Sequence, residues 1–221
     1  MSDPAAWPEK RLSQCPLCGA TGLTPVRTPP PRRYATCPVC HLVSLDPKQR
    51  PTAAEEKAEY DLHENDPDDP RYRKWLSRLV GPMMEGVTAP IFALDFGSGP
   101  GPTIAPMLEE RGHSCRNYDP FYATDQAELE TSYERIFCSE TAEHFFAPAT
   151  EFAQLFKMLR PGGRLGVMTQ MLTPDIDFAT WRYRLQPSHV VFYRPQTMAW
   201  IANAHEATLD LQLPDVAIFG R

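Results

Sequence analysis

The chain has 221 residues, of which 42% are hydrophobic and 23% charged, which is typical of a folded globular protein and not of a disordered or fibrous one. Its formal net charge of −6 argues against a protein whose main task is to hold nucleic acid, because phosphate binding needs a basic surface. No apolar run approaches the roughly 20 residues that span a bilayer, and residues 1–14 lack the apolar centre of a secretory signal, so we expect a cytoplasmic protein without a membrane segment.

A zinc ribbon is predicted at the start of the chain, over residues 1–46, with a flexible N-terminus before it. Two C-x2-C pairs, with 18 residues between them, have the spacing of a four-thiolate zinc site. Gly19 and His41 follow the two pairs, where such turns need a permissive backbone. Two disulfides are the alternative, and they would need an oxidising compartment. The expected structural zinc ligands are Cys15, Cys18, Cys37 and Cys40.

Residues 47–88 are predicted to form a connecting segment with two helices. The first covers residues 53–60, with Thr52 as its N-cap and Glu55 three residues later in a capping box. The second, residues 72–84, carries apolar side chains at helical spacing.

This connecting segment has two interpretations. It is either a solvated loop, or it lies across the mouth of an active site, where Tyr60, His63 and Tyr72 would touch a ligand.

A glycine-rich turn follows a predicted buried strand at residues 91–96. After the turn come a helix at residues 103–111, a strand at 115–118 and an acid, Asp119. In Rossmann-like crevices glycines let the backbone approach a ligand, and an acid at the next strand end binds ribose hydroxyls. The turn reads G-x-G-x-G, which disfavours a dinucleotide oxidoreductase because that class carries G-x-G-x-x-G.

The string D-F-G-S-G-P-G resembles motif I of class I S-adenosylmethionine methyltransferases. Residues 135–140 resemble the fourth strand of that family, and L-R-P-G-G at residues 159–163 is similar to the turn before its fifth. The resemblance implies an α/β fold over residues 89–221, a Rossmann-like mostly parallel sheet with an antiparallel C-terminal hairpin. Only residues 120–134 remain between the second and fourth strands, so the family's third strand is trimmed here.

The resemblance also implies which residues bind the S-adenosylmethionine cofactor. Relatives often contact the adenine side with an acid after the third strand, and here we expect Phe121 to stack on the adenine instead. Alternatively, Phe121 is an aromatic residue of the core. The expected cofactor-binding residues are Asp95, Gly97, Ser98, Gly99, Gly101, Asp119, Phe121 and Glu140.

Candidate catalytic residues follow the fourth strand and the fifth. Glu140 and His144 belong to an E-x-x-E-H string that resembles hydroxyl-methylating enzymes of quinone biosynthesis, where such residues are associated with a divalent metal, so Mg²⁺ is a second cofactor to consider. His144 could instead be a general base, or merely shape the loop. His189 is the candidate for a contact with the acceptor, or is a packed side chain. Trp181 and Tyr183 line an aromatic pocket or belong to the core.

The sequence therefore predicts methyl transfer from S-adenosylmethionine to a small-molecule acceptor, with a hydroxyl as one target. The alternatives are an RNA-base methyltransferase that grips RNA through the zinc ribbon, and a non-catalytic adaptor that binds the donor. The acidic charge disfavours the first, and the intact glycine turn with its acid disfavours the second.

Overall fold

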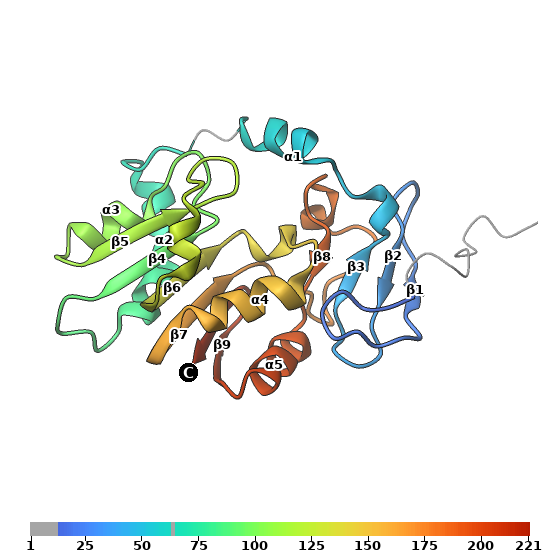
Figure 1. Ribbon diagram of the computed structural model, residues 1–221. Helices are drawn as coiled ribbons and strands as arrows, with labels where there is room; N and C mark the ends of the chain where they lie inside the picture. Colours follow the sequence, from blue (N-terminus) through green and yellow to red (C-terminus); the bar gives the residue numbers. More distant parts are fainter. Residues whose placement is uncertain (1–12, 63–64) are drawn as a thin grey trace, which may run out of the picture.

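The structure is a computed structural model, and it describes residues 13–62 and 65–221 (Figure 1). The expected flexible N-terminus and His63 lie outside these residues. Among the helices that the structure describes, none has the length and apolarity to cross a bilayer.

The N-terminal ribbon is a small antiparallel sheet of β1 (Thr24–Val26), β2 (Tyr34–Thr36) and β3 (Val43–Leu45). The backbone at Gly19 and His41 is left-handed, with φ of 71° and 60°, as the turns after the two cysteine pairs were expected to require. A fourth strand, β8 (Val191–Phe192), completes this sheet from far along the chain.

The connecting segment contains both predicted helices. After a 3-10 turn (Pro47–Gln49), α1 (Ala53–Tyr60) begins with the predicted capping box between Thr52 and Glu55. The next helix, α2 (Pro70–Met84), buries one apolar face and begins two residues earlier than predicted, because Asp69 caps it and proline suits the first helical position.

The main sheet has the strand order β5-β4-β6-β7-β10-β9. Its first four strands are parallel, and β10 is antiparallel to both β7 and β9, so the predicted α/β class with a C-terminal hairpin is confirmed. The strands are β4 (Phe92–Phe96), β5 (Ser114–Tyr118), β6 (Tyr133–Ser139), β7 (Leu159–Met168), β9 (Thr208–Gln212) and β10 (Val216–Gly220).

Two segments refine the predicted boundaries. The L-R-P-G-G residues 159–163 belong to β7 itself, since Leu159 already pairs with Tyr133 across a register shift. Between β5 and β6 there is only a 3-10 helix (Gln126–Glu130), which agrees with the expected trimming of this region, and β5 is therefore an edge strand.

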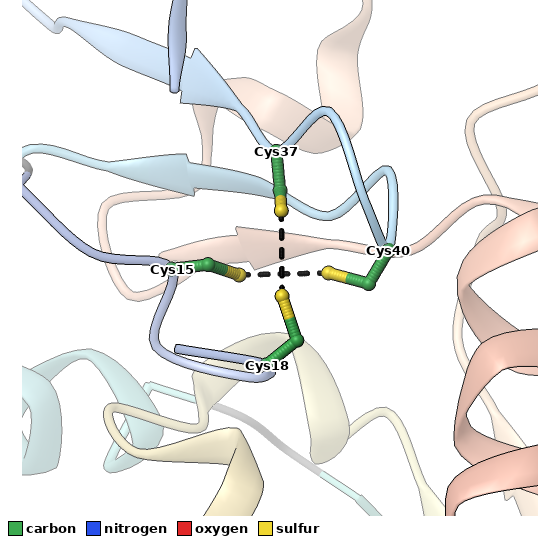
Figure 2. Close-up of side chains that lie close together, drawn as sticks. All are labelled: Cys15, Cys18, Cys37 and Cys40. Atoms are coloured by element: carbon green, nitrogen blue, oxygen red, sulfur yellow. Dashed lines mark hydrogen bonds between the residues drawn. The ribbon is translucent and has the colours of Figure 1, made fainter. Parts of the chain in front are cut away.

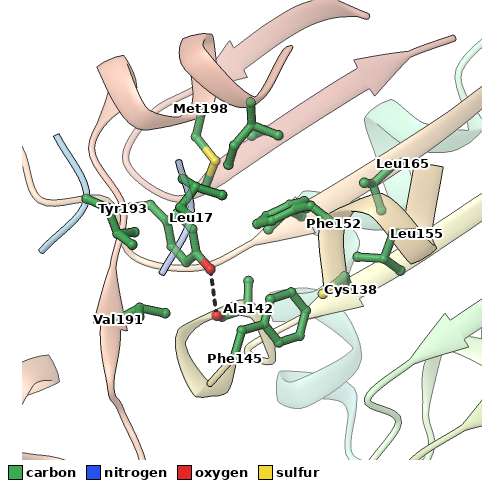
Figure 3. Close-up of a cluster of buried hydrophobic side chains, with 14 of the residues drawn as sticks. Leu17, Cys138, Ala142, Phe145, Phe152, Leu155, Leu165, Val191, Tyr193 and Met198 are labelled. Carbon is green, nitrogen blue, oxygen red and sulfur yellow. Dashed lines mark hydrogen bonds between the residues drawn. The ribbon is translucent and has the colours of Figure 1, made fainter. Parts of the chain in front are cut away.

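Helices cover both faces of the main sheet. One apolar cluster joins α2 and α3 (Ile104–Glu109) to one face. A second, larger cluster joins α4 (Pro148–Lys157) and α5 (Pro195–Ala204) to the other, and the ribbon contributes to it (Figure 3). Leu17 of the ribbon lies beside Tyr193 in this cluster, so the ribbon packs into the core of the larger unit.

Candidate functional site

The four ribbon cysteines point toward a common centre (Figure 2). Their sulfur atoms lie within 4.8 Å of one another, with 3.5 Å between Cys15 and Cys40 and 3.4 Å between Cys18 and Cys37. A tetrahedral zinc ion with bonds of about 2.3 Å would separate its thiolates by about 3.8 Å, whereas a disulfide needs about 2 Å. None of the four forms a disulfide, so the residues fit a structural zinc ion.

The glycine turn after β4 is held between the end of β5 and the residue that follows Glu140 after β6. Gly97 and Gly99 have φ of 77° and 64°, a left-handed backbone that glycine adopts without strain. The N–H groups of Gly97 and Ser98 donate to the carbonyl of Tyr118 at 2.8 and 3.2 Å. A Cβ at Gly97 would lie 2.8 Å from the Cβ of Thr141, so no larger residue fits this position.

Asp119 stands at the end of β5, where its carboxylate accepts three backbone hydrogen bonds. The donors are the N–H groups of Gly99 at 2.9 Å, Phe121 at 2.8 Å and Tyr122 at 3.1 Å. The acid thus fixes the glycine turn from the neighbouring strand. Burial, and then the charge of Asp119, raise the pKa of Asp95 to about 7.

Two observations suit a bound donor at this place. The hydroxyl of Ser98 is buried without a hydrogen-bond partner in the part of the chain that the structure describes, which leaves a polar atom for a ligand to satisfy. The ring of Phe121 is partly exposed, and its centroid lies 5.9 Å from that of Tyr60.

Asn65, which lies between α1 and α2, is packed against the glycine turn. A Cβ at Gly101 would lie 2.9 Å from the Cβ of Asn65. Tyr60, the last residue of α1, packs edge-on against His144 with 5.3 Å between ring centroids. Tyr72 stacks on Trp75 in α2. The contacts of Asn65 and Tyr60 place parts of the connecting segment beside the glycine turn and His144, whereas the Tyr72 contact lies within α2.

A buried polar network lies at the carboxyl end of β6. Tyr183 donates to Glu143, and its hydroxyl oxygen lies 3.3 Å from Glu140 and 3.1 Å from Thr169. One carboxylate oxygen of each glutamate is buried without a partner among the described residues. Glu140 also has a φ of 47°, an unfavourable backbone conformation that tends to occur at functional sites.

Both glutamates hold their protons more strongly than usual. Burial, and next the charge of Glu143, raise the pKa of Glu140, and burial raises that of Glu143 although the Tyr183 hydrogen bond opposes it. Carboxyl groups with such shifts cluster at sites that bind or exchange protons and cations.

The two predicted histidines lie together beside this network. Their ring centroids are 4.8 Å apart. Nδ1 of His144 lies 3.0 Å from the carbonyl oxygen of Ser188, and Nδ1 of His189 lies 2.8 Å from that of Tyr183. A carbonyl can only accept, so each neutral ring carries its proton on Nδ1 and has Nε2 as its basic atom. Nε2 of His189 is 3.9 Å from Glu143.

Glu143, His144 and His189 can each place one ligand atom within 4.8 Å of the others. One carboxylate with two imidazoles suits a transition metal better than Mg²⁺, which prefers oxygen ligands. Glu140 is not a member of this group.

The structure therefore brings together the glycine turn, Asp119 and the residues after β6 at the carboxyl ends of neighbouring parallel strands. Sequence reasoning missed the part played by Tyr183, whose contacts with Glu140 and Glu143 span about 40 residues of sequence. Its position in an aromatic W-R-Y-R string was the available signal, and that string was also compatible with a core residue.

Comparisons with known proteins agree with this geometry. The sequence model of the methyltransferase domain family matches residues 40–211. A SAM-dependent methyltransferase from Archaeoglobus fulgidus, 13% identical, aligns over 68% of this chain and 94% of its own with a TM-score of 0.52. The mitomycin 7-O-methyltransferase MmcR, 12% identical, aligns over 76% of this chain and 66% of its own with a TM-score of 0.50. At such identities the likeness shows the fold alone. A comparison with curated protein sequences gives no match.

Proposed function

Because the chain belongs to the methyltransferase domain family, as its sequence predicted, we propose that it transfers the methyl group of S-adenosylmethionine to a hydroxyl of a small-molecule acceptor. Family and fold make it an S-adenosylmethionine-dependent methyltransferase. The observation that carries the proposal on the acceptor is the pair of oriented imidazoles beside buried carboxyl groups, at the sheet edge that also holds the glycine turn.

The donor would lie along the glycine turn. Asp119 would accept hydrogen bonds from ribose hydroxyls, since each carboxylate oxygen has more than one acceptor site. Ser98 would bind a polar group of the donor, and Phe121 with Tyr60 would offer aromatic surface to the adenine. The pKa values of Asp95 and Glu140 are raised by burial, and a bound sulfonium would lower them, because a nearby cation favours the ionised form of a carboxyl group.

Methyl transfer is an in-line displacement, for which alignment is the main contribution of the protein. The hydroxyl proton would pass to Nε2 of His144 or His189 as the oxygen bonds to the methyl carbon and the carbon–sulfur bond breaks, releasing S-adenosylhomocysteine. Glu143, beside His189, would stabilise the imidazolium that forms.

The same residues could instead bind a metal ion. The close ligand atoms of Glu143, His144 and His189 favour a divalent transition metal that would bind and acidify the acceptor hydroxyl. Titration of the zinc-replete protein with Mn²⁺, followed by electron paramagnetic resonance, tests this use. Mn²⁺ that binds to the wild type and not to His189→Ala supports the metal, whereas Mn²⁺ that stays free supports the imidazole base. In the ribbon, the four cysteines would hold Zn²⁺ as a structural ion.

Calorimetric titration with S-adenosylhomocysteine tests the donor site, with NADH as the control ligand. We expect micromolar binding of S-adenosylhomocysteine alone, and at least about tenfold weaker binding to Asp119→Ala, which loses a charged acceptor. Asp210→Ala, at an exposed position of β9, is the matched control and should bind as the wild type does. Equal affinity of all three proteins would contradict the proposed donor site.

Two further expectations belong to the proposal. A small-molecule acceptor predicts that RNA is not retained in gel-shift experiments, whereas salt-sensitive retention would favour the RNA-base alternative. The cytoplasmic location stays a prediction.

A further inference from the structure

The ribbon is joined to the candidate active site by shared strand pairing. Val43 and Ser44 of β3 pair with Phe192 and Val191 of β8. Just before β8, the carbonyl of Val190 accepts from the N–H of Leu45 at 2.8 Å.

The other side of Val190 faces the candidate site. Its N–H donates to the carbonyl of Glu143 at 2.9 Å, so one residue connects the ribbon to the loop that carries the buried carboxyl group.

Arg32 of the ribbon makes a second and denser connection. Its two terminal nitrogens donate to four backbone carbonyls of residues 184–189, at distances between 2.8 and 3.1 Å. The guanidinium also lies over the ring of Tyr34, with 5.6 Å to the centroid. The four acceptors are the carbonyl oxygens of Arg184, Gln186, Pro187 and His189.

Four converging carbonyls favour a positive donor group between them, because their dipoles repel one another. Two of them have a second donor, since the carbonyl of Gln186 also accepts from the N–H of His189 at 3.2 Å and that of Arg184 from the hydroxyl of Tyr34 at 3.4 Å. The planar guanidinium, with its five N–H donors, meets this need, whereas a lysine ammonium offers three donors from one point. The conformation of residues 184–189 therefore depends on Arg32.

The conformation of this loop determines the contacts of Glu143 and of the two histidines. Residue 183 supplies the hydroxyl that binds Glu143 and the carbonyl that fixes the Nδ1 proton of His189, and the carbonyl of Ser188 does the same for His144. A loop that opened would release both rings.

We propose that Arg32 is a positioning residue, through which the ribbon fixes the loop bearing Tyr183, Ser188 and His189. The catalytic part of this proposal rests on the proposed function. The ordering of the loop does not depend on it.

Hydrogen exchange of the zinc-replete full chain, read by mass spectrometry, tests the ordering directly. Arg32→Ala should raise the exchange rates of the amides of residues 186 and 188–190 by at least about tenfold, as expected when a charge-assisted contact of the native state is lost. Arg27→Ala removes an exposed arginine of the same ribbon and should leave these rates unchanged. Arg32→Lys should fall between the wild type and Arg32→Ala.

Nitrogen NMR of the histidines tests the positioning role, because it reports which ring nitrogen carries the proton. In the wild type, His189 should show a proton fixed on Nδ1, and in Arg32→Ala both tautomers should be populated. The affinity for S-adenosylhomocysteine should change by less than about threefold, because the donor turn lies on other elements. If the donor binds to neither protein, the proposed function fails, while the exchange and tautomer readouts still decide on Arg32.

Two results would overturn the proposal. One is an Arg32→Ala or Arg32→Lys protein in which residues 186 and 188–190 stay protected and His189 keeps its tautomer. The other needs no variant: in the wild type, the amides of Leu45 and Val190 should exchange at closely similar rates, and a loop that opens independently of β3 would show that the ribbon does not hold it.

Discussion

The hydroxyl of Tyr183 is the donor that stabilises the buried carboxylate of Glu143, and Tyr183→Phe removes it with little change in volume. A hydrogen bond to a charged group contributes about 1.5–3 kcal/mol. Its loss should therefore raise the pKa of Glu143 by about one to two units. The cost should depend on pH, because the protonated form of Glu143 needs this donor less.

The free energy of unfolding depends on pH because the pKa of Glu143 differs between the folded and the unfolded chain. Burial raises the pKa of Glu143 to about 7, above the value of about 4.3 in an unfolded chain, so its contribution favours folding at low pH and declines as the pH rises to about 7. In Tyr183→Phe the folded-state pKa is higher still, so the decline continues further. The deficit in the free energy of unfolding should grow by about 2 kcal/mol between pH 6 and pH 9.

Urea unfolding of the zinc-replete protein at several pH values measures this deficit. Tyr193→Phe is the matched control, since Tyr193 is likewise a buried tyrosine but donates to the carbonyl of Ala142 at 2.9 Å. Burial raises the pKa of both tyrosines, so neither hydroxyl ionises in this range. The control deficit should be constant with pH. A constant deficit for Tyr183→Phe as well would refute our account of the Glu143 network.

Three other substitutions test the donor turn and the ribbon. Asp95→Asn should remove the cost of ionising a buried acid, so between pH 5.5 and 7 the wild type should lose about 2 kcal/mol of stability relative to this variant. If the stability difference between the two proteins stays constant over this range, the raised pKa of about 7 is contradicted. Gly97→Ala places a Cβ 2.8 Å from that of Thr141 at a positive φ, and we expect at least about tenfold weaker binding of S-adenosylhomocysteine by calorimetry. Cys37→Ser should lower the zinc content measured by metal analysis, whereas Cys115→Ser, in β5, should retain it.

Features carried by neighbouring residues could be predicted from the sequence. Two examples are the capping box of Thr52 and Glu55 and the turn at Gly97. Each depends on residues a few positions apart, so the local amino-acid sequence determines it. The parallel sheet followed from the resemblance of several such segments to one family, together with the missing length between β5 and β6.

Features that depend on tertiary packing could not be predicted. Arg32 lies 152 residues from its first carbonyl partner, and nothing around an arginine in a proline-rich stretch indicates four backbone acceptors. Likewise β8 has only two residues, too few for a periodic pattern, and it pairs with a sheet that begins near the other end of the chain. The role of Tyr183 depended on that same packing.

The short connection between β5 and β6 leaves β5 at the border of the sheet, with one row of backbone groups that no strand among residues 13–62 and 65–221 covers. Such a border can recruit a strand from another molecule and so start aggregation. Here Arg116 projects from the middle of β5, 63% exposed, and its Nε lies 3.9 Å from the carboxylate of Glu128 in the following 3-10 helix. A charge at this place must be desolvated before a strand of a second molecule can pair with β5, and this cost disfavours pairing at the open border.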